Sequence, residues 1–246
     1  MSADLLSVQI TSEGKIPYSR GLWIFMGYFA TRWIVAASTI LWLDQFRGLS
    51  SDKVSLATAY AGILGEILAA GAAWLLVRHY YRSQVSVESG VSIGLFPISI
   101  RQSAVSALAG VALAAVAIAL SAAFPSGSRA AGSAVDAYTM HGRALLYAWM
   151  IAGIAVAPFA EELLSRGVVF SVVSSHFNTF VGAVASVALF MAVHVSQVMH
   201  YWTSAMAIFM LGAMCAFVRA KGMPLWAAVI LHGTYNAVLS VWTMIR

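Results

Sequence analysis

The sequence contains few charged residues and a single cysteine. Only 9% of its 246 residues are Asp, Glu, Lys or Arg, whereas 61% are hydrophobic. Soluble domains carry about 25% charged residues, so this composition excludes an ordinary soluble domain and indicates a protein that crosses a membrane several times. Cys215 lies in an apolar run, and as the only cysteine it excludes a disulfide framework within the chain.

Basic residues outnumber acidic ones by 14 to nine, which gives a net charge of +5. Such a balance can indicate nucleic-acid binding, but here the basic residues are scattered at the ends of hydrophobic segments, where they orient a membrane protein. With the N-terminus in the cytoplasm, seven Lys or Arg fall on the cytoplasmic side and five on the outer side. We therefore predict a cytoplasmic N-terminus and no nucleic-acid partner. The high alanine content favours a bacterial source, and hence the bacterial cytoplasmic membrane.

Hydrophobic segments of spanning length recur along the chain. A membrane-spanning helix needs roughly 20 apolar residues. Seven segments meet this requirement: 21–43, 54–77, 103–124, 146–174, 180–199, 202–218 and 224–244. We predict an all-α polytopic transmembrane helix bundle of about seven spans, with six to eight allowed, that forms one integral-membrane domain over residues 1–246. Residues 125–142 are predicted to form an exposed loop, and residues 80–102 to hold a short interfacial segment.

Two adjacent glutamates and an arginine interrupt the fourth segment. Glu161, Glu162 and Arg166 lie between the stretches 148–160 and 167–193, neither of which contains Asp, Glu, Lys or Arg. Ionisable groups at that depth are costly and usually mark a functional site. Glu162 and Arg166 are four residues apart and can pair on one helix face. Glu161 points about 100° away from Glu162 and is left to face a cavity.

Three further polar residues fall at a similar depth in later segments. With a rise of about 1.5 Å per residue, Glu162 lies roughly 18 Å and His194 roughly 21 Å from the inner ends of their helices. His232 lies about 12 Å and Asn236 about 18 Å from the start of the last segment. Packed helices can therefore bring these groups together near the middle of the membrane.

This set of side chains matches the requirements of hydrolysis by an activated water molecule. Glu161 can act as a general base, and His194 can orient the water beside it. His232 and Asn236, four residues apart on one helix face, can both donate hydrogen bonds to a developing oxyanion. Two histidines and a carboxylate are also a plausible zinc site, although the HExxH spacing of helical metalloproteases is absent. The residues by themselves leave both a zinc site and a site without metal open.

A second pair of intramembrane charges is predicted in the first two segments. Arg32 and Glu66 each lie 11 residues from the inner end of their segment. Because an unpaired charge at that depth would be very costly, we predict an ion pair between them. The pair can be structural or can line a substrate cavity.

The motifs of the C-terminal half resemble those of a known protease family. Glu161-Glu162-Leu-Leu-Ser-Arg166, Phe190-Met-Ala-Val-His194 and His232-Gly-Thr-Tyr-Asn236 are similar to the EExxxR, FxxxH and HxxxN motifs of the CPBP intramembrane proteases. This family contains the CAAX prenyl endopeptidases and proteins linked to bacteriocin processing and self-immunity. The resemblance covers the predicted catalytic core helices of residues 145–244.

The resemblance implies a glutamate-type intramembrane endopeptidase that acts on a membrane-associated or lipidated protein. It also implies a site without cofactor or metal, with zinc as the alternative. By the resemblance, Glu161 activates water with help from His194, while His232 and Asn236 form the oxyanion hole and Glu162 and Arg166 support the site. Two other classes of function remain open. One is a proton-coupled transporter in which the carboxylates and His194 relay protons; the other is a non-catalytic scaffold or bacteriocin-immunity protein.

Overall fold

The computed structural model describes residues 18–45, 51–81, 92–124 and 142–245, and all regular secondary structure in these residues is helical. The predicted all-α class is confirmed. Most of the predicted loop at 125–142 and about half of the segment at 80–102 lie outside the described residues. The elements are α1 (Tyr18–Gln45), α2 (Ser51–Tyr80), α3 (Ile100–Ala123), α5 (Arg143–Ile151), η3 (Ala152–Val156), α6 (Ala157–Glu162), η4 (Leu163–Val169), α7 (Phe170–His176), α8 (Thr179–Val193), α9 (Val195–His200), α10 (Trp202–Ala220) and α11 (Leu225–Met244).

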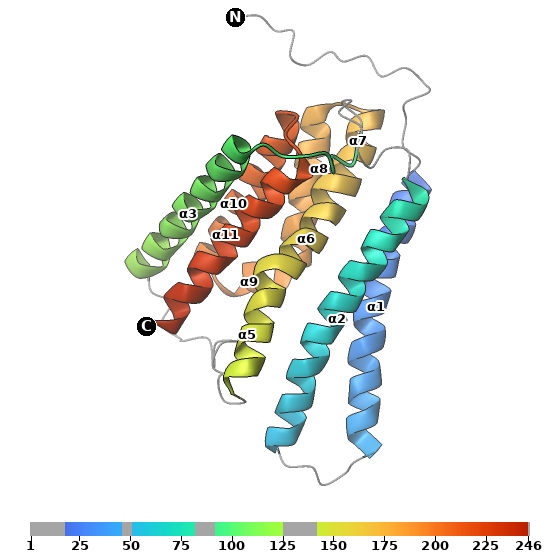
Figure 1. Ribbon diagram of the computed structural model, residues 1–246, viewed down its shortest axis with the longest axis vertical. Helices are drawn as coiled ribbons and strands as arrows, with labels where there is room; N and C mark the ends of the chain where they lie inside the picture. The colour runs from blue at the N-terminus through green and yellow to red at the C-terminus, as the bar shows by residue number, and fades with distance from the viewer. Residues whose placement is uncertain (1–17, 46–50, 82–91, 125–141, 246) are drawn as a thin grey trace, which may run out of the picture.

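The helices are arranged around one long central run. Helices α5 to α7, with the two π-helical stretches η3 and η4, form a continuous run of 34 residues, Arg143–His176. Helices α1 and α2 pack along each other and contact one side of this run, while α11 contacts it from the other side and packs along α3. Helix α10 contacts α8, α3 and α11 (Figure 1). The central run therefore carries Glu161 and Glu162 between the α1–α2 pair and the C-terminal helices.

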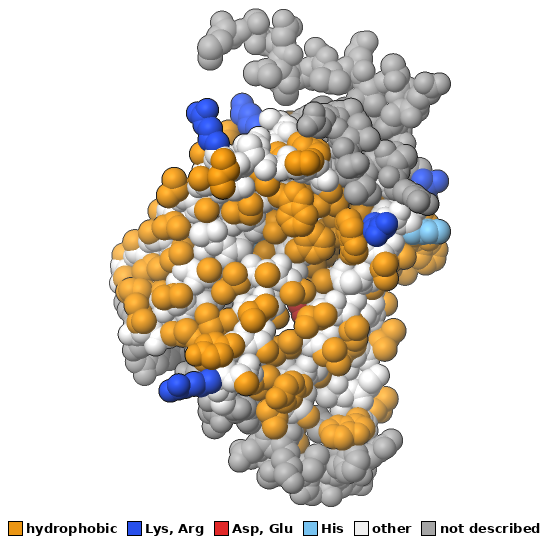
Figure 2. Space-filling view, in the orientation of Figure 1, with side chains coloured by type: hydrophobic (Ala, Val, Ile, Leu, Met, Phe, Trp, Pro, Cys, Tyr) orange, Lys and Arg blue, Asp and Glu red, His pale blue; other side chains and the backbone are white. Residues whose placement is uncertain are grey.

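The surface of the molecule is that of a membrane protein. Apolar side chains cover the middle of the face shown in Figure 2, and the basic side chains lie near its two ends. Among the described residues, five helical runs are long and apolar enough to cross a membrane: Leu56–Tyr80, Ile100–Ala123, Arg143–His176, Trp202–Ala220 and Leu225–Met244. The predicted count of about seven is not confirmed, and the sidedness of the N-terminus stays a prediction.

The predicted continuous span at 180–199 is wrong, because the helix is broken at His194. Helix α8 ends at Val193 after 15 residues, and the six-residue α9 begins at Val195. His194 has φ −101° and ψ 18°, outside the helical region. At about 1.5 Å per residue α8 is roughly 22 Å long, shorter than the ~30 Å hydrocarbon core of a bilayer. The break places the side chain of His194 at a helix end inside the bundle.

The predicted ion pair between Arg32 and Glu66 is confirmed. Arg32 Nη1 contacts Glu66 Oε2, and Tyr28 donates a hydrogen bond of 2.9 Å to Glu66 Oε1. The pair joins α1 to α2 within the bundle, and the Glu66 side chain is only 10% exposed. The Arg32 side chain is 47% exposed and lines a cavity, so the pair both joins the two helices and borders this cavity.

Arg219, one of the seven basic residues assigned to the cytoplasmic side, is buried. Its guanidinium donates hydrogen bonds to three backbone carbonyls, those of Met223 (2.6 Å), Ser92 (3.0 Å) and Arg166 (3.4 Å). The residues from Ser92 onward, part of the predicted interfacial segment, are not helical up to the start of α3 and cover this guanidinium. Gly94 has φ 81°, and a Cβ there would lie 2.6 Å from Arg219 Cζ, so the segment can approach the arginine only with glycine at this position.

Helix α11 approaches the central run so closely that Gly233 has no room for a side chain. A Cβ at Gly233 would lie 2.6 Å from the backbone oxygen of Ile154 in η3. Pro158 lacks the N–H that an α-helix would direct at this same carbonyl, which accounts for irregular helix at this point. The glycine thus lets α11 place its neighbour His232 against α6.

Gly233→Ala is expected to lower the free energy of unfolding by about 1–3 kcal/mol, because the added methyl group meets rigid backbone. The single cysteine, Cys215, is fully buried, so thermal unfolding in detergent can be followed by its reaction with a maleimide dye. Gly71→Ala is the matched control, since nothing lies within 4 Å of a Cβ at that helical position; it should be neutral or stabilising by up to about 1 kcal/mol. Equal stability of the two variants would contradict the close contact.

Candidate active site

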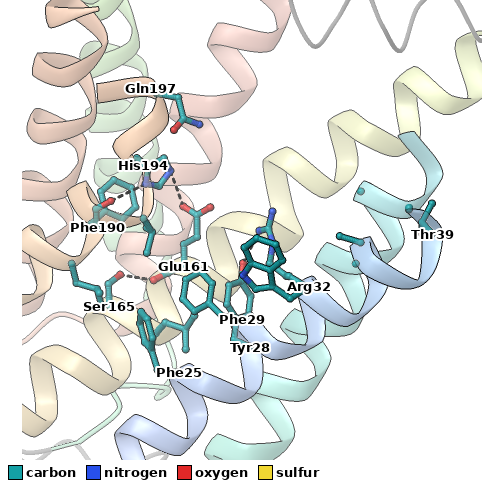
Figure 3. A pocket seen from close by; sticks show the side chains of 18 of the residues that line it. Phe25, Tyr28, Phe29, Arg32, Thr39, Glu161, Ser165, Phe190, His194 and Gln197 are labelled. Atoms are coloured by element: carbon teal, nitrogen blue, oxygen red, sulfur yellow. Dashed lines mark hydrogen bonds and ion pairs between the residues drawn. The ribbon is translucent and has the colours of Figure 1, made fainter. Parts of the chain in front are cut away.

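Three side chains from three helices meet at one carboxylate oxygen. Glu161 on α6 directs its Oε2 at His194 Nε2, 3.6 Å away, and at His232 Nε2 on α11, 3.9 Å away (Figure 3 shows the contact with His194). Both distances exceed that of a direct hydrogen bond. The oxygen is buried and accepts no hydrogen bond from the part of the chain that the structure describes. The predicted convergence of these groups from distant segments is confirmed.

The two histidine rings are held by their other nitrogens. His194 Nδ1 lies 2.8 Å from the carbonyl oxygen of Phe190, and His232 Nδ1 lies 2.9 Å from Glu162 Oε1. A carbonyl and a carboxylate only accept hydrogen bonds, so both Nδ1 atoms carry the proton. Both Nε2 atoms are thereby turned toward Glu161.

The local backbone explains these positions. Helix α6 is flanked on both sides by π-helical stretches, η3 before it and η4 after it. Such stretches are rare and often occur at functional sites. The break after Val193 leaves the carbonyl of Phe190 at the end of α8, where it accepts a hydrogen bond from the side chain of His194. Phe190 itself packs against both rings, with centroid distances of 4.5 Å to His194 and 5.6 Å to His232.

The predicted pair of Glu162 and Arg166 forms and lies behind the site. Both side chains are fully buried, with Arg166 Nη1 3.1 Å from Glu162 Oε1. Arg166 also donates to Ser165 Oγ (2.8 Å) and to the backbone oxygen of Gly212 (2.7 Å), and its guanidinium lies 4.5 Å from the centre of the Phe190 ring. Because Glu162 Oε1 also receives His232, this pair fixes the position of that histidine.

Asn236 lies one helical turn beyond His232. Its Nδ2 donates a hydrogen bond of 2.8 Å to the backbone oxygen of Gly153 in η3. One of its two N–H groups is therefore used to join α11 to the central run. The other N–H is the group that an oxyanion role would require.

Sequence reasoning missed three contributors to the site. The hydroxyl of Ser165 donates to the Glu161 carbonyl and accepts from Arg166. Its position inside the EExxxR motif was the available signal. Gly212 leaves space for the Arg166 guanidinium, since a Cβ there would lie 3.3 Å from its Nη2. Tyr28 bridges the pair of Arg32 and Glu66, and its spacing of four residues from Arg32 could have indicated this.

A cavity of about 550 Å³ lies beside Glu161. Helices α1 and α2 form one wall, with Phe25, Phe29 and Trp33 among its aromatic residues. The opposite wall comes from α6, η4 and α8 and carries Glu161 and His194 (Figure 3). The prediction that Glu161 faces a cavity is confirmed. Most of the lining is apolar, so the cavity suits an apolar segment with a polar bond at its reactive end.

The zinc alternative requires several ligand side chains placed around one point. Within the described ranges, no group of three or more His, Cys, Asp or Glu side chains is placed so that it could hold a metal ion. The candidate zinc ligands of the sequence, His194 and His232, have their Nε2 atoms 3.6 and 3.9 Å from Glu161 Oε2.

Residues 143–238 match the family model described as type II CAAX prenyl endopeptidase Rce1-like. The match confirms the resemblance to the CPBP and CAAX proteases, and its range includes all six predicted site residues. Searches among curated proteins and among solved structures found no match. The five long apolar helices fit an integral, multi-pass membrane protein, and residues 143–238 of the chain are similar to proteases of the CAAX type.

Proposed function

We propose that the protein is an intramembrane endopeptidase in which Glu161 activates a water molecule to hydrolyse a peptide bond of a membrane-associated or lipidated protein. One observation carries the proposal. The buried Oε2 of Glu161 faces two imidazole Nε2 atoms at 3.6 and 3.9 Å, separations that suit a bridging water molecule better than direct hydrogen bonds. A water held there is next to the cavity that Glu161 and His194 line.

The chemistry follows from the hydrogen bonds of these groups. Since His194 donates through Nδ1, its neutral ring offers the Nε2 lone pair to one hydrogen of the water, while Glu161 accepts the other. As the water oxygen attacks the substrate carbonyl, Glu161 takes its proton. It then returns the proton to the leaving nitrogen as the carbon–nitrogen bond breaks.

The developing oxyanion is stabilised from α11. His232 donates a hydrogen bond from Nδ1 to Glu162 and keeps that proton. When the ring is doubly protonated, it donates a second hydrogen bond through Nε2, and the carboxylate of Glu162 balances the charge of the ring. The second N–H of Asn236 is the other donor in this proposal. Preorganised donors of this kind typically contribute about 10²- to 10³-fold to the rate.

The experiment is cleavage of membrane peptides by the purified protein in nanodiscs, with and without the chelator 1,10-phenanthroline. We propose a metal-independent site, so we expect the chelator to leave the rate unchanged. Loss of activity with chelator, and its recovery when zinc is added back, would assign the site to metal-assisted hydrolysis instead.

The same preparation separates the rival functions. A proton-coupled transporter would move a solute in response to a proton gradient across liposomes and would give no cleavage product. A non-catalytic scaffold or immunity protein would bind its partner whether or not Glu161 is present. Mass spectrometry of the peptides distinguishes hydrolysis from both.

A further inference from the structure

Arg32 holds its place through only one of its three nitrogens. The two N–H groups of Nη1 go to Tyr28 Oη (3.1 Å) and to Glu66 Oε2. Tyr28 in turn donates to the other oxygen of Glu66 at 2.9 Å, which closes a three-residue ring of hydrogen bonds. Across the described residues, neither Nε nor Nη2 of Arg32 makes a hydrogen bond. Three N–H donors are left, and two of them lie parallel on the edge formed by Nε and Nη2.

This side chain borders the cavity opposite the catalytic carboxylate. Arg32 and Tyr28 belong to the α1 wall, and Glu161 and His194 belong to the other wall (Figure 3). The Arg32 side chain is 47% exposed, although its neighbours in the cavity include Phe29 and Trp33. A cation presented to a mostly apolar cavity inside a membrane is a functional feature by default.

The edge formed by Nε and Nη2 is the part of a guanidinium that binds a carboxylate with two parallel hydrogen bonds. Glu66 approaches at Nη1 and leaves this edge open. The pair with Glu66 is formally neutral, so a bound carboxylate gains mainly from directed hydrogen bonds. Removing the charge of Glu66 should therefore strengthen its binding.

We propose that Arg32 is a subsite for a carboxylate of the substrate, positioned across the cavity from Glu161. This inference rests on the proposed function, because it assumes that the cavity receives the substrate. The carboxylate can be the C-terminus of the substrate or an Asp or Glu side chain. In the first case, because Arg32 and Glu161 line the same cavity of about 550 Å³, cleavage is restricted to a bond near the end of the substrate chain.

Binding is measured in the Glu161→Gln background, where bound peptide is not consumed. The probes are three N-palmitoylated apolar pentapeptides: one with a free C-terminal carboxylate, its C-terminal amide, and an amide with Glu as last residue. The double variant Arg32→Gln/Glu66→Gln, made in the same background, is the matched control. It removes both charges together, so no buried carboxylate is left unpaired. Each peptide partitions into lipid to the same extent with either protein, so this effect cancels in the comparison.

We expect the preference for acid over amide, as a ratio of Kd values, to be about tenfold or more higher with Arg32 present than in the double variant. Glu66→Gln alone should keep or increase this preference, which a purely structural pair would not do. If the amide peptide that ends in Glu binds tightly, the subsite accepts any carboxylate. If this peptide binds weakly while the acid peptide binds tightly, the subsite is specific for the C-terminal carboxylate. If the ratio of Kd values for amide and acid peptides is the same with Arg32 as in the double variant, the inference is overturned, whether the peptides bind tightly or weakly.

Protein with Glu161 intact separates this inference from the proposed function. Hydrolysis of acid and amide peptides at equal rates would leave the protease proposal standing and remove the role of Arg32. Arg32-dependent carboxylate binding without hydrolysis of any bound peptide would retain the subsite and overturn the protease.

Discussion

Glu161→Gln is expected to lower kcat/KM for peptide hydrolysis by about 10²- to 10⁴-fold, the range that a general base contributes. The amide has nearly the shape of the carboxylate but cannot take a proton from water. The Glu161 side chain is 20% exposed at the edge of the cavity and has no hydrogen bond at Oε2, so the exchange breaks no contact there that supports the fold. The loss should therefore fall on the rate and leave stability nearly unchanged.

The measurement is the initial rate of peptide cleavage in nanodiscs, with the maleimide reaction of buried Cys215 as the check on folding. Glu161→Asp is the matched variant, because it keeps the carboxylate and withdraws it by one methylene group. We expect an intermediate rate for this variant. A folded Glu161→Gln protein that cleaves as fast as wild type would overturn the role of Glu161 and with it the proposed mechanism.

Counting residues along helices predicted the intramembrane pairs well. Arg32 and Glu66 were placed together because both lie 11 residues from a helix end, and Glu162 and Arg166 because they are one turn apart. Charge inside a membrane leaves few alternatives to pairing, so depth alone is nearly sufficient. The same argument from depth predicted that Glu161, His194 and His232 lie close together, although the catalytic roles of these residues stay predictions.

The break at His194 could not be read from the sequence in this way. The residues around it are apolar, and neither proline nor glycine marks the end of α8, so the pattern predicts an unbroken span. At the end of α8 the ring of His194 forms a hydrogen bond with the carbonyl oxygen of Phe190. Whether a side chain competes with the helix in this way depends on its tertiary surroundings. The π-helical stretches beside α6 have no simple sequence signal either.

The sequence also did not predict which backbone carbonyls accept hydrogen bonds from the buried arginines. Arg219 was counted among the basic residues that orient the chain, yet it is 6% exposed and bound to three carbonyls. Arg166 likewise bonds the Gly212 carbonyl from 46 positions away. Any residue has a carbonyl, so sequence carries no information on which one will be the acceptor.

Arg166→Met is expected to lower the free energy of unfolding by about 3–5 kcal/mol, the largest stability effect we predict. The substitution removes the bonds to Glu162, Ser165 and Gly212 and leaves Glu162 as a fully buried carboxylate whose remaining partner is the Nδ1 of His232. An uncompensated buried charge, rather than lost packing, dominates this loss, because methionine fills most of the same volume against Phe190.

The double variant Glu162→Gln/Arg166→Met tests that cause. It removes both charges while the glutamine carbonyl can still accept from His232 Nδ1, so most of the lost stability should return, as found when buried ion pairs are replaced by neutral groups. Unfolding of both variants is followed through Cys215. A double variant as unstable as Arg166→Met alone would show that the guanidinium acts by packing. If instead the double variant is stable but slow in cleavage, Glu162 serves the reaction by balancing the charge of His232, and the pair is retained for catalysis rather than for the fold.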